Sequence, residues 1–198
     1  MEKTRLELFS DAVIAIIITI MVLEMKVPHG AEWGNLLTML PKFVSYTLSF
    51  LFIAIYWVNH HHLLHTVKIA TSAIMWANIN LLFWLSLVPF ATAWMGENHF
   101  EKQTVVAYSV LALLCSLAFN LLQRAVVKDH ERLKNLEEII KPKGWKSIGS
   151  VILYALAIPI ALFLSAAVAG GIFFLVAIIW FVPDRKIEKI ESVENAKH

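Results

Sequence analysis

Residues 5–28 read RLELFSDAVIAIIITIMVLEMKVP, and this stretch decides the class of fold. Its central part, AVIAIIITIMVL at 12–23, carries no charge, and with the flanking turns it reaches the roughly 20 apolar residues that a helix needs to cross a bilayer. The run ends at Glu24, Lys26 and Pro28 and has no small-residue cleavage site. We therefore expect a retained transmembrane helix rather than a cleaved signal peptide.

The composition of the whole chain agrees with a membrane protein. Hydrophobic residues make up 59% of the 198 residues and charged residues 16%, whereas soluble domains usually contain about 45–50% apolar residues. A net charge of +2 gives no reason to expect nucleic acid as a partner. The single cysteine, Cys115, excludes a disulfide within one chain. Lipid is thus the expected main solvent.

Apolar stretches recur along nearly the whole chain and predict an all-α integral membrane protein with six transmembrane helices in one domain, residues 1–198. The uncharged run 148–183 would extend about 54 Å as a single helix, so we expect it to form a hairpin broken at Gly170-Gly171. The predicted spans lie near 7–27, 43–64, 69–93, 104–126, 148–168 and 170–183.

The distribution of Lys and Arg predicts the orientation of these helices. With the N-terminus inside, only Lys26, Lys42 and Lys102 of the 17 Lys and Arg residues fall on the outer side. An even number of spans then places the C-terminus inside as well. We expect a multi-pass protein of the cell membrane with both termini cytoplasmic.

The first helix carries an apolar stripe and, away from it, a carboxylate. At about 100° per residue one face holds Phe9, Ala12, Ile16, Thr19, Ile20, Leu23 and Val27, while Asp11 points nearly opposite to Ile16. By itself, such a stripe is usually a lipid-facing or packed surface. Asp11 needs a polar partner at this depth, and the candidates on the same half of the membrane are Arg5, Trp57, Asn59, His60, Asn78 and Asn80. A satisfied network of this kind would lock helices one to three together.

The run Asn59-His60-His61-His62 with His65 suggests a metal site at first sight. Consecutive histidines on a helix point about 100° apart, however, and no acidic residue lies nearby in the sequence. We therefore expect no metal, and a hydrogen-bonding role for His60. No Gly-rich phosphate loop, HExxH helix or nucleophile elbow is present, so we expect neither a cofactor nor an enzyme.

Several motifs in the first half of the chain resemble one family. Residues 5–19, RLELFSDAVIAIIIT, are similar to the R-x-x-x-F-S-D signature that opens the first helix of the transmembrane protein 175 family of potassium channels. The similarity continues through LEMKVP at 23–28, Trp57-x-x-His60, Asn80 and Pro89-Phe90. The later helices match only in number and character.

The resemblance implies a potassium-permeable leak channel, a homotetramer whose pore is lined by helix one of each subunit, with no TVGYG filter. It assigns the narrowest apolar rings to Ile16, Ile20 and Leu23, and an ion-contacting hydroxyl layer to Thr19. Glu24 would lie at the outer mouth, where it could concentrate cations, although a glutamate at the lipid interface explains it equally well. The family's interhelical polar lock corresponds to Arg5, Ser10, Asp11, Trp57, His60 and Asn80.

Two other functions remain open from the sequence. In an ion- or proton-coupled carrier, Asp11 and His60 would relay protons instead of locking helices, but the two halves of the chain show no internal similarity of the kind that carriers often have. A membrane-embedded enzyme using the histidines would need carboxylates or further histidines in helices four to six, and the cores of those helices supply none.

Overall fold

A computed structural model of the chain describes residues 3–67, 69–130 and 144–181. Every regular element within these ranges is a helix, so the prediction of an all-α fold is confirmed. The helices are α1 (Lys3–Leu23), α2 (Trp33–Leu37), α3 (Leu40–His65), α4 (Ser72–Ser86), α5 (Val88–Glu97), α6 (Lys102–His130), α8 (Gly144–Phe163) and α9 (Ala166–Phe181).

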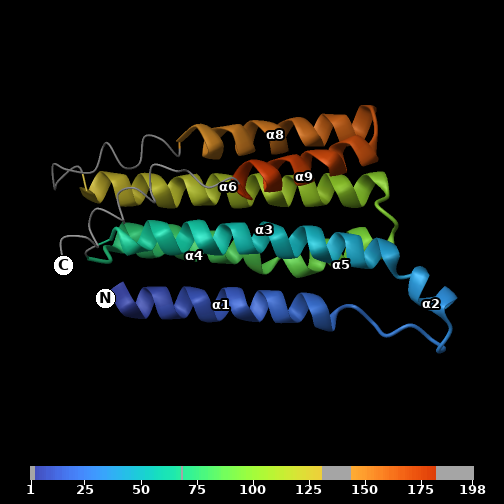
Figure 1. Cartoon of the computed structure of the whole chain (residues 1–198). Coiled ribbons are helices and arrows are strands. Elements are labelled where there is room, and N and C mark those ends of the chain that lie inside the picture. The colour runs from blue at the N-terminus through green and yellow to red at the C-terminus, as the bar shows by residue number, and fades with distance from the viewer. Residues whose placement is uncertain (1–2, 68, 131–143, 182–198) are drawn as a thin grey trace.

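The long helices run side by side in a layered bundle (Figure 1). Helix α1 lies at one edge and packs on α3, α4 and α5. The hairpin of α8 and α9 lies at the opposite edge, where α8 packs mainly on α6. The short helix α2 sits beyond the bundle, in the connection between α1 and α3. This order leaves one side of α1 without a neighbour from its own chain.

Five helical segments are long and apolar enough to cross a membrane, so the chain is a membrane protein. They are Lys3–Leu23, Leu40–His65, Ser72–Glu97, Lys102–Lys128 and Lys146–Phe163. The remaining apolar helix, α9, has 16 residues within the part of the chain that the structure describes, which ends at residue 181. Except at the hairpin, the predicted spans overlap these segments with shifts of a few residues at the ends.

The third segment is interrupted where a proline prevents a continuous helix. Helix α4 ends at Ser86 and α5 begins at Val88, with Leu87 between them and Pro89 in the first turn of α5. A proline has no backbone N–H to donate and its ring clashes with the preceding turn, so it is accommodated best at the start of a helix. Leu87 N–H bonds instead to Trp84 O at 3.2 Å, which keeps α4 and α5 nearly collinear (Figure 1).

The predicted break at Gly170-Gly171 was wrong. The turn between α8 and α9 lies at Leu164 and Ser165, and both glycines are inside α9. A Cβ built on either glycine would meet nothing within 4 Å, so these positions require no special backbone geometry. Both Leu164 N–H and Ser165 N–H bond to Ile160 O at 2.9 Å and close the end of α8.

Candidate functional site

The two faces of α1 differ sharply in their surroundings. Leu6, Ser10, Ile14, Ile17 and Met21 are buried against the rest of the bundle. They follow one another at three- or four-residue steps, which places them along one face of the helix. This periodic face fixes the rotation of α1 about its own axis.

The apolar stripe predicted from the sequence lies on the other side of α1. The exposed fractions are 56% for Ile16, 40% for Ile20 and 79% for Leu23, and Phe9, Ala12 and Thr19 on the same face are also exposed. The helical phase that the sequence predicts is therefore the phase in the structure. A face of this kind is available to lipid or to another subunit.

Thr19 is oriented by its own helix. Its hydroxyl donates a hydrogen bond to the carbonyl oxygen of Ile16 at 2.9 Å. Because the single hydroxyl proton is used in this bond, the oxygen lone pairs remain free to face outward. An oxygen presented in this way can contact a cation, but it cannot also donate a proton to an anion.

A groove runs along α1 where that helix meets α4 and α5. Its volume is about 450 Å³, and Ile16 and Ile20 form part of one wall while Phe90 lies on the other. Glu24 follows the last residue of α1, is exposed, and lies at the end of the same groove. The structure thus brings Ile16, Ile20 and Glu24 to one continuous surface.

A buried hydrogen-bonded chain joins α1, α3 and α4. His60 Nε2 lies 2.6 Å from Asn78 Oδ1, and Asn78 Nδ2 donates to Ser10 Oγ at 2.9 Å. Ser10 Oγ donates in turn to the carbonyl oxygen of Leu6 at 2.8 Å. The three side chains are at most 1% exposed. If His60 carries its proton on Nε2, each group in the chain donates to the next, from His60 through Asn78 and Ser10 to the carbonyl oxygen of Leu6. Such a complete set of bonds is expected of a structural network.

A second contact ties α1 to α3 at a more exposed position. Trp57 Nε1 donates to Asp11 Oδ1 at 3.0 Å. Asp11 is only partly buried and Trp57 is exposed, so this pair lies at the rim of the buried chain of Ser10, Asn78 and His60. The indole N–H can only donate, and a carboxylate can only accept, which makes the pair complementary.

The remaining two members of the predicted lock are not joined to these contacts. Asn80 is half-buried, and within the part of the chain that the structure describes neither Asn80 nor Arg5 makes a side-chain hydrogen bond or ion pair. Asn78 occupies the central position instead of Asn80. Residues 78 and 80 differ by about 200° around a helix, so only one of them can face α1 and α3.

A further polar network, which the sequence analysis did not identify, lies between α3, α5 and α6. Thr92 Oγ1 lies 2.7 Å from both Ser49 Oγ and the carbonyl oxygen of Val88, and Ser45 Oγ donates to Thr92 O at 2.7 Å. Ser49 Oγ also lies 2.9 Å from the hydroxyl of Tyr108. The only sequence signal was the recurrence of small polar residues inside apolar spans, a common feature of packed membrane helices.

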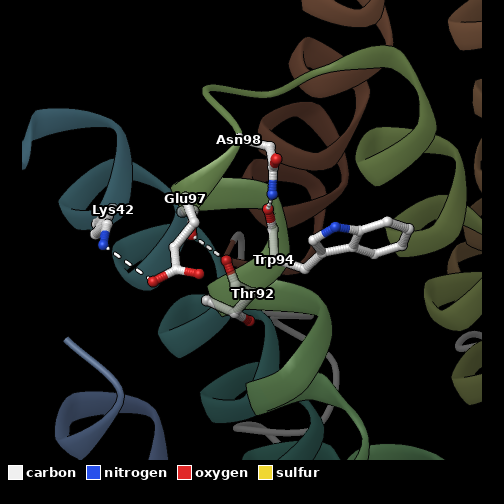
Figure 2. Close-up of polar contacts among 6 residues, drawn as sticks. Lys42, Thr92, Trp94, Glu97 and Asn98 are labelled. Carbon is white, nitrogen blue, oxygen red and sulfur yellow. Dashed lines mark hydrogen bonds and ion pairs between the residues drawn. The ribbon is translucent and has the colours of Figure 1, made fainter. Parts of the chain in front are cut away.

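An ion pair joins the start of α3 to the end of α5, which lie on the outer side in the predicted orientation. Lys42 Nζ contacts Glu97 Oε1 at 3.1 Å, as Figure 2 shows. At the same place, α5 approaches α3 so closely that a Cβ on Gly96, the residue before Glu97, would lie 2.9 Å from Lys42 Cα. Gly96 is thus required by the distance between the two backbones.

The histidine cluster forms a column of rings without a metal arrangement. His61 lies 6.3 Å from Trp57 and 6.4 Å from His65, measured between ring centroids. Among residues 3–67, 69–130 and 144–181, no three His, Cys, Asp or Glu side chains are grouped as metal ligands would be. His60 points away from this column toward Asn78.

Known proteins resemble this chain over both halves. The sequence model of the family described as "Endosomal/lysosomal potassium channel TMEM175" matches residues 5–89. A protein of Chryseobacterium sp. (strain P1-3), named as a potassium channel, is 46% identical over 96% of this chain and 97% of its own length. A protein of Streptomyces collinus, also named as a potassium channel, is 36% identical over 61% of this chain and 63% of its own length.

The fold agrees with a solved structure of the same kind. The crystal structure of a lysosomal potassium-selective channel TMEM175 homolog from Chamaesiphon minutus matches with a TM-score of 0.78 at 29% identity. The match covers 90% of this chain and 95% of that chain, and so includes the later helices that the family sequence model leaves out. The predictions of the family and of a non-enzymatic function are confirmed. The chain therefore belongs to the TMEM175 family of ion channels.

Proposed function

We propose that this chain is a subunit of a potassium-permeable cation leak channel. The observation that carries the proposal is the exposed stripe of Ile16, Ile20 and Leu23 on a helix whose opposite face is locked to the bundle. One copy of α1 cannot enclose a pore, whereas four copies around an axis can. We therefore propose a homotetramer with α1 of each subunit lining the pore.

The proposed topology follows the positive-inside rule. Six membrane crossings in a single domain, with α4 and α5 counted as one and α9 as the sixth, keep both termini on the cytoplasmic side of the cell membrane. In this orientation Arg5 lies at the inner end of α1 and Glu24 at the outer mouth. Four Glu24 carboxylates around the axis would raise the local concentration of cations.

Selectivity in this proposal depends on dehydration at an apolar constriction. Rings of Ile16, Ile20 and Leu23 replace little of the hydration that an ion loses there, so the ion that sheds water more readily passes more easily. Potassium holds its water less tightly than sodium does. The Thr19 oxygens offer partial replacement, and the chain contains no TVGYG sequence that would supply a carbonyl filter.

The alternative of an ion- or proton-coupled carrier assigns relay roles to Asp11 and His60. Their contacts favour a structural role, because Asp11 accepts from Trp57 and His60 is engaged by Asn78 within a buried chain. A relay group needs a path to water on each side during the cycle. His60 is 1% exposed, which supports the lock.

The test is potassium flux in proteoliposomes, driven by a potassium gradient with an impermeant cation outside. Ile16→Asn should wet the constriction, raise the flux and reduce the preference for potassium over sodium. Val22→Asn is the matched control, since Val22 is 45% exposed on the same helix but lies about 120° away from Ile16. It should leave both properties close to those of the unmodified protein.

Each outcome is informative about the pore. Protein-dependent flux that changes in Ile16→Asn and not in Val22→Asn supports a pore lined by the stripe. Equal effects of the two variants would contradict the assignment of the constriction to Ile16. No flux from a correctly assembled oligomer in any of the three proteins would favour the carrier.

A further inference from the structure

A cavity lies inside the subunit, on the side of α3 away from α1. It is partly open, is lined by residues of α3, α6, α8 and α9, and has a volume of about 30 Å³. Aromatic side chains form much of its wall, among them Phe52, Phe119 and Phe173. None of the predicted pore or lock residues lines it, so this cavity is separate from the proposed ion path.

Hydroxyl groups are distributed around this otherwise apolar wall. The hydroxyl of Tyr108, which lines the cavity, is hydrogen-bonded to Ser49, which does not line it. Ser150 accepts a hydrogen bond from Trp180 Nε1 at 2.8 Å and donates to the carbonyl oxygen of Lys146. Each of these lining groups has a protein partner.

Tyr154 differs from Tyr108 and Ser150. Its side chain is 3% exposed and lines the cavity, and among the described residues its hydroxyl has no hydrogen-bond partner. The ring is held in place by contacts with Phe52 and Phe173 at centroid distances of 6.2 Å. A buried hydroxyl without a partner is unfavourable in any protein interior, and more so in one surrounded by lipid. The cavity therefore needs a polar occupant.

The volume of the cavity limits what that occupant can be. One water molecule needs roughly 10–15 Å³ of such space, so about two fit. A benzene-sized molecule needs an apolar cavity of around 150 Å³ and is too large. A site with several hydroxyl groups in its wall also provides the two to four partners that a buried water requires.

We propose that this cavity is a built hydration site, in which ordered water bonds to the Tyr154 hydroxyl and bridges it to neighbouring hydroxyl groups of α3 and α6. Water thus fills a gap among the direct side-chain contacts that join α3 to α6 and α8. The attachment of the α8–α9 hairpin thus depends on bound water as well as on apolar packing.

The sign of one stability change tests the proposal. Tyr154→Phe removes only the hydroxyl oxygen. If water bonds to that oxygen, the variant should unfold at a lower temperature, by roughly 2–4 °C for a protein of this size. If the cavity is dry, removing an unpartnered hydroxyl should leave the unfolding temperature unchanged or raise it, and that result would overturn the proposal. Tyr46→Phe, at a half-buried tyrosine outside the cavity, controls for the loss of a hydroxyl elsewhere.

Radiolytic labelling of the full-length protein in its assembled form provides a second test. Hydroxyl radicals formed from bound water oxidise the side chains next to it, so Tyr154 and Phe173 should be oxidised despite their burial. Met95 is 0% exposed, does not line the cavity and is intrinsically more reactive; it should stay intact. Absence of oxidation at Tyr154, or equal oxidation of Met95, would contradict a localised hydration site.

Discussion

Replacing Asn78 with alanine tests the buried chain that fixes α1 to α3 and α4. The amide of Asn78 contacts His60 Nε2 at 2.6 Å and donates to Ser10 Oγ at 2.9 Å. Alanine can make neither bond. His60 and Ser10 would remain buried without that partner, because both are already enclosed by the packing of the helices.

The expected loss of stability follows from the number of bonds and from their surroundings. Hydrogen bonds between membrane helices contribute about 0.6 kcal/mol on average and up to about 1.7 kcal/mol. Two such bonds give a loss of about 1–3 kcal/mol for Asn78→Ala. Values for soluble interiors, where an unsatisfied buried group costs about 1–3 kcal/mol, predict a somewhat larger loss. Both estimates are large enough to measure.

The assay is reversible unfolding of the purified protein in mixed micelles, followed by circular dichroism. A double-mutant cycle with Ser10→Ala isolates the Asn78–Ser10 bond, for which we expect a coupling energy of about 0.5–1.5 kcal/mol. Asn80→Ala is the control, since Asn80 lies on the same helix and forms no side-chain bond with the described residues. It should change stability by less than about 0.5 kcal/mol.

Two results would refute this reasoning. A coupling energy indistinguishable from zero would mean that the contact at 2.9 Å adds no stability. A larger loss for Asn80→Ala than for Asn78→Ala would mean that the family resemblance identified the correct asparagine and that the geometry around Asn78 is misleading. The two failures differ, because only the second leaves the lock itself intact.

Three further changes test other contacts. Gly96→Ala should lower the free energy of unfolding by about 1–3 kcal/mol, because the new Cβ would lie 2.9 Å from Lys42 Cα. Gly171→Ala, whose Cβ would meet nothing within 4 Å, should be neutral or slightly stabilising in the same unfolding assay. Asp11→Ala should mainly reduce assembly, because it removes the bond from Trp57 that ties α1 to α3, and size-exclusion chromatography should show a smaller oligomer fraction. A well-assembled variant with altered ion preference would contradict the role of Asp11 in the lock. Lys42→Met should change the free energy of unfolding by less than about 1 kcal/mol, because the ion pair with Glu97 is exposed. Unfolding measured at several salt concentrations should also lose the salt dependence that this pair contributes. A larger loss of stability would contradict the weak contribution expected of an exposed pair.

The helical period of the sequence predicted which residues of α1 share a face, and the family resemblance indicated that the stripe faces away from its own bundle. Residues of one face are buried at three- and four-residue steps, and the stripe containing Ile16, Ile20 and Leu23 falls on the other. Trp57, which bonds to Asp11, was one of six candidate partners expected from the need for a polar group at that depth. The shared face follows from the helical period alone, whereas the choice among the candidate partners of Asp11 required the structure.

Features that depend on how two helices meet were harder to predict. The choice between Asn78 and Asn80 depends on the rotation of α4, whose nearly uniform apolar sequence gives no strong phase. The turn of the hairpin was misplaced because glycine was taken as a helix breaker, although membrane helices tolerate it. The network around Thr92 joins residues 43 and more positions apart, and no local pattern indicates which small polar residues will meet.

The apolar character of the stripe on α1 has a consequence for the free subunit. Ile16, Ile20 and Leu23 carry hydrocarbon side chains, and the Thr19 hydroxyl already donates to the carbonyl oxygen of Ile16. A single subunit can therefore expose this face to lipid without leaving a hydrogen-bond donor unsatisfied. Insertion and folding of each subunit can thus precede its association with other copies.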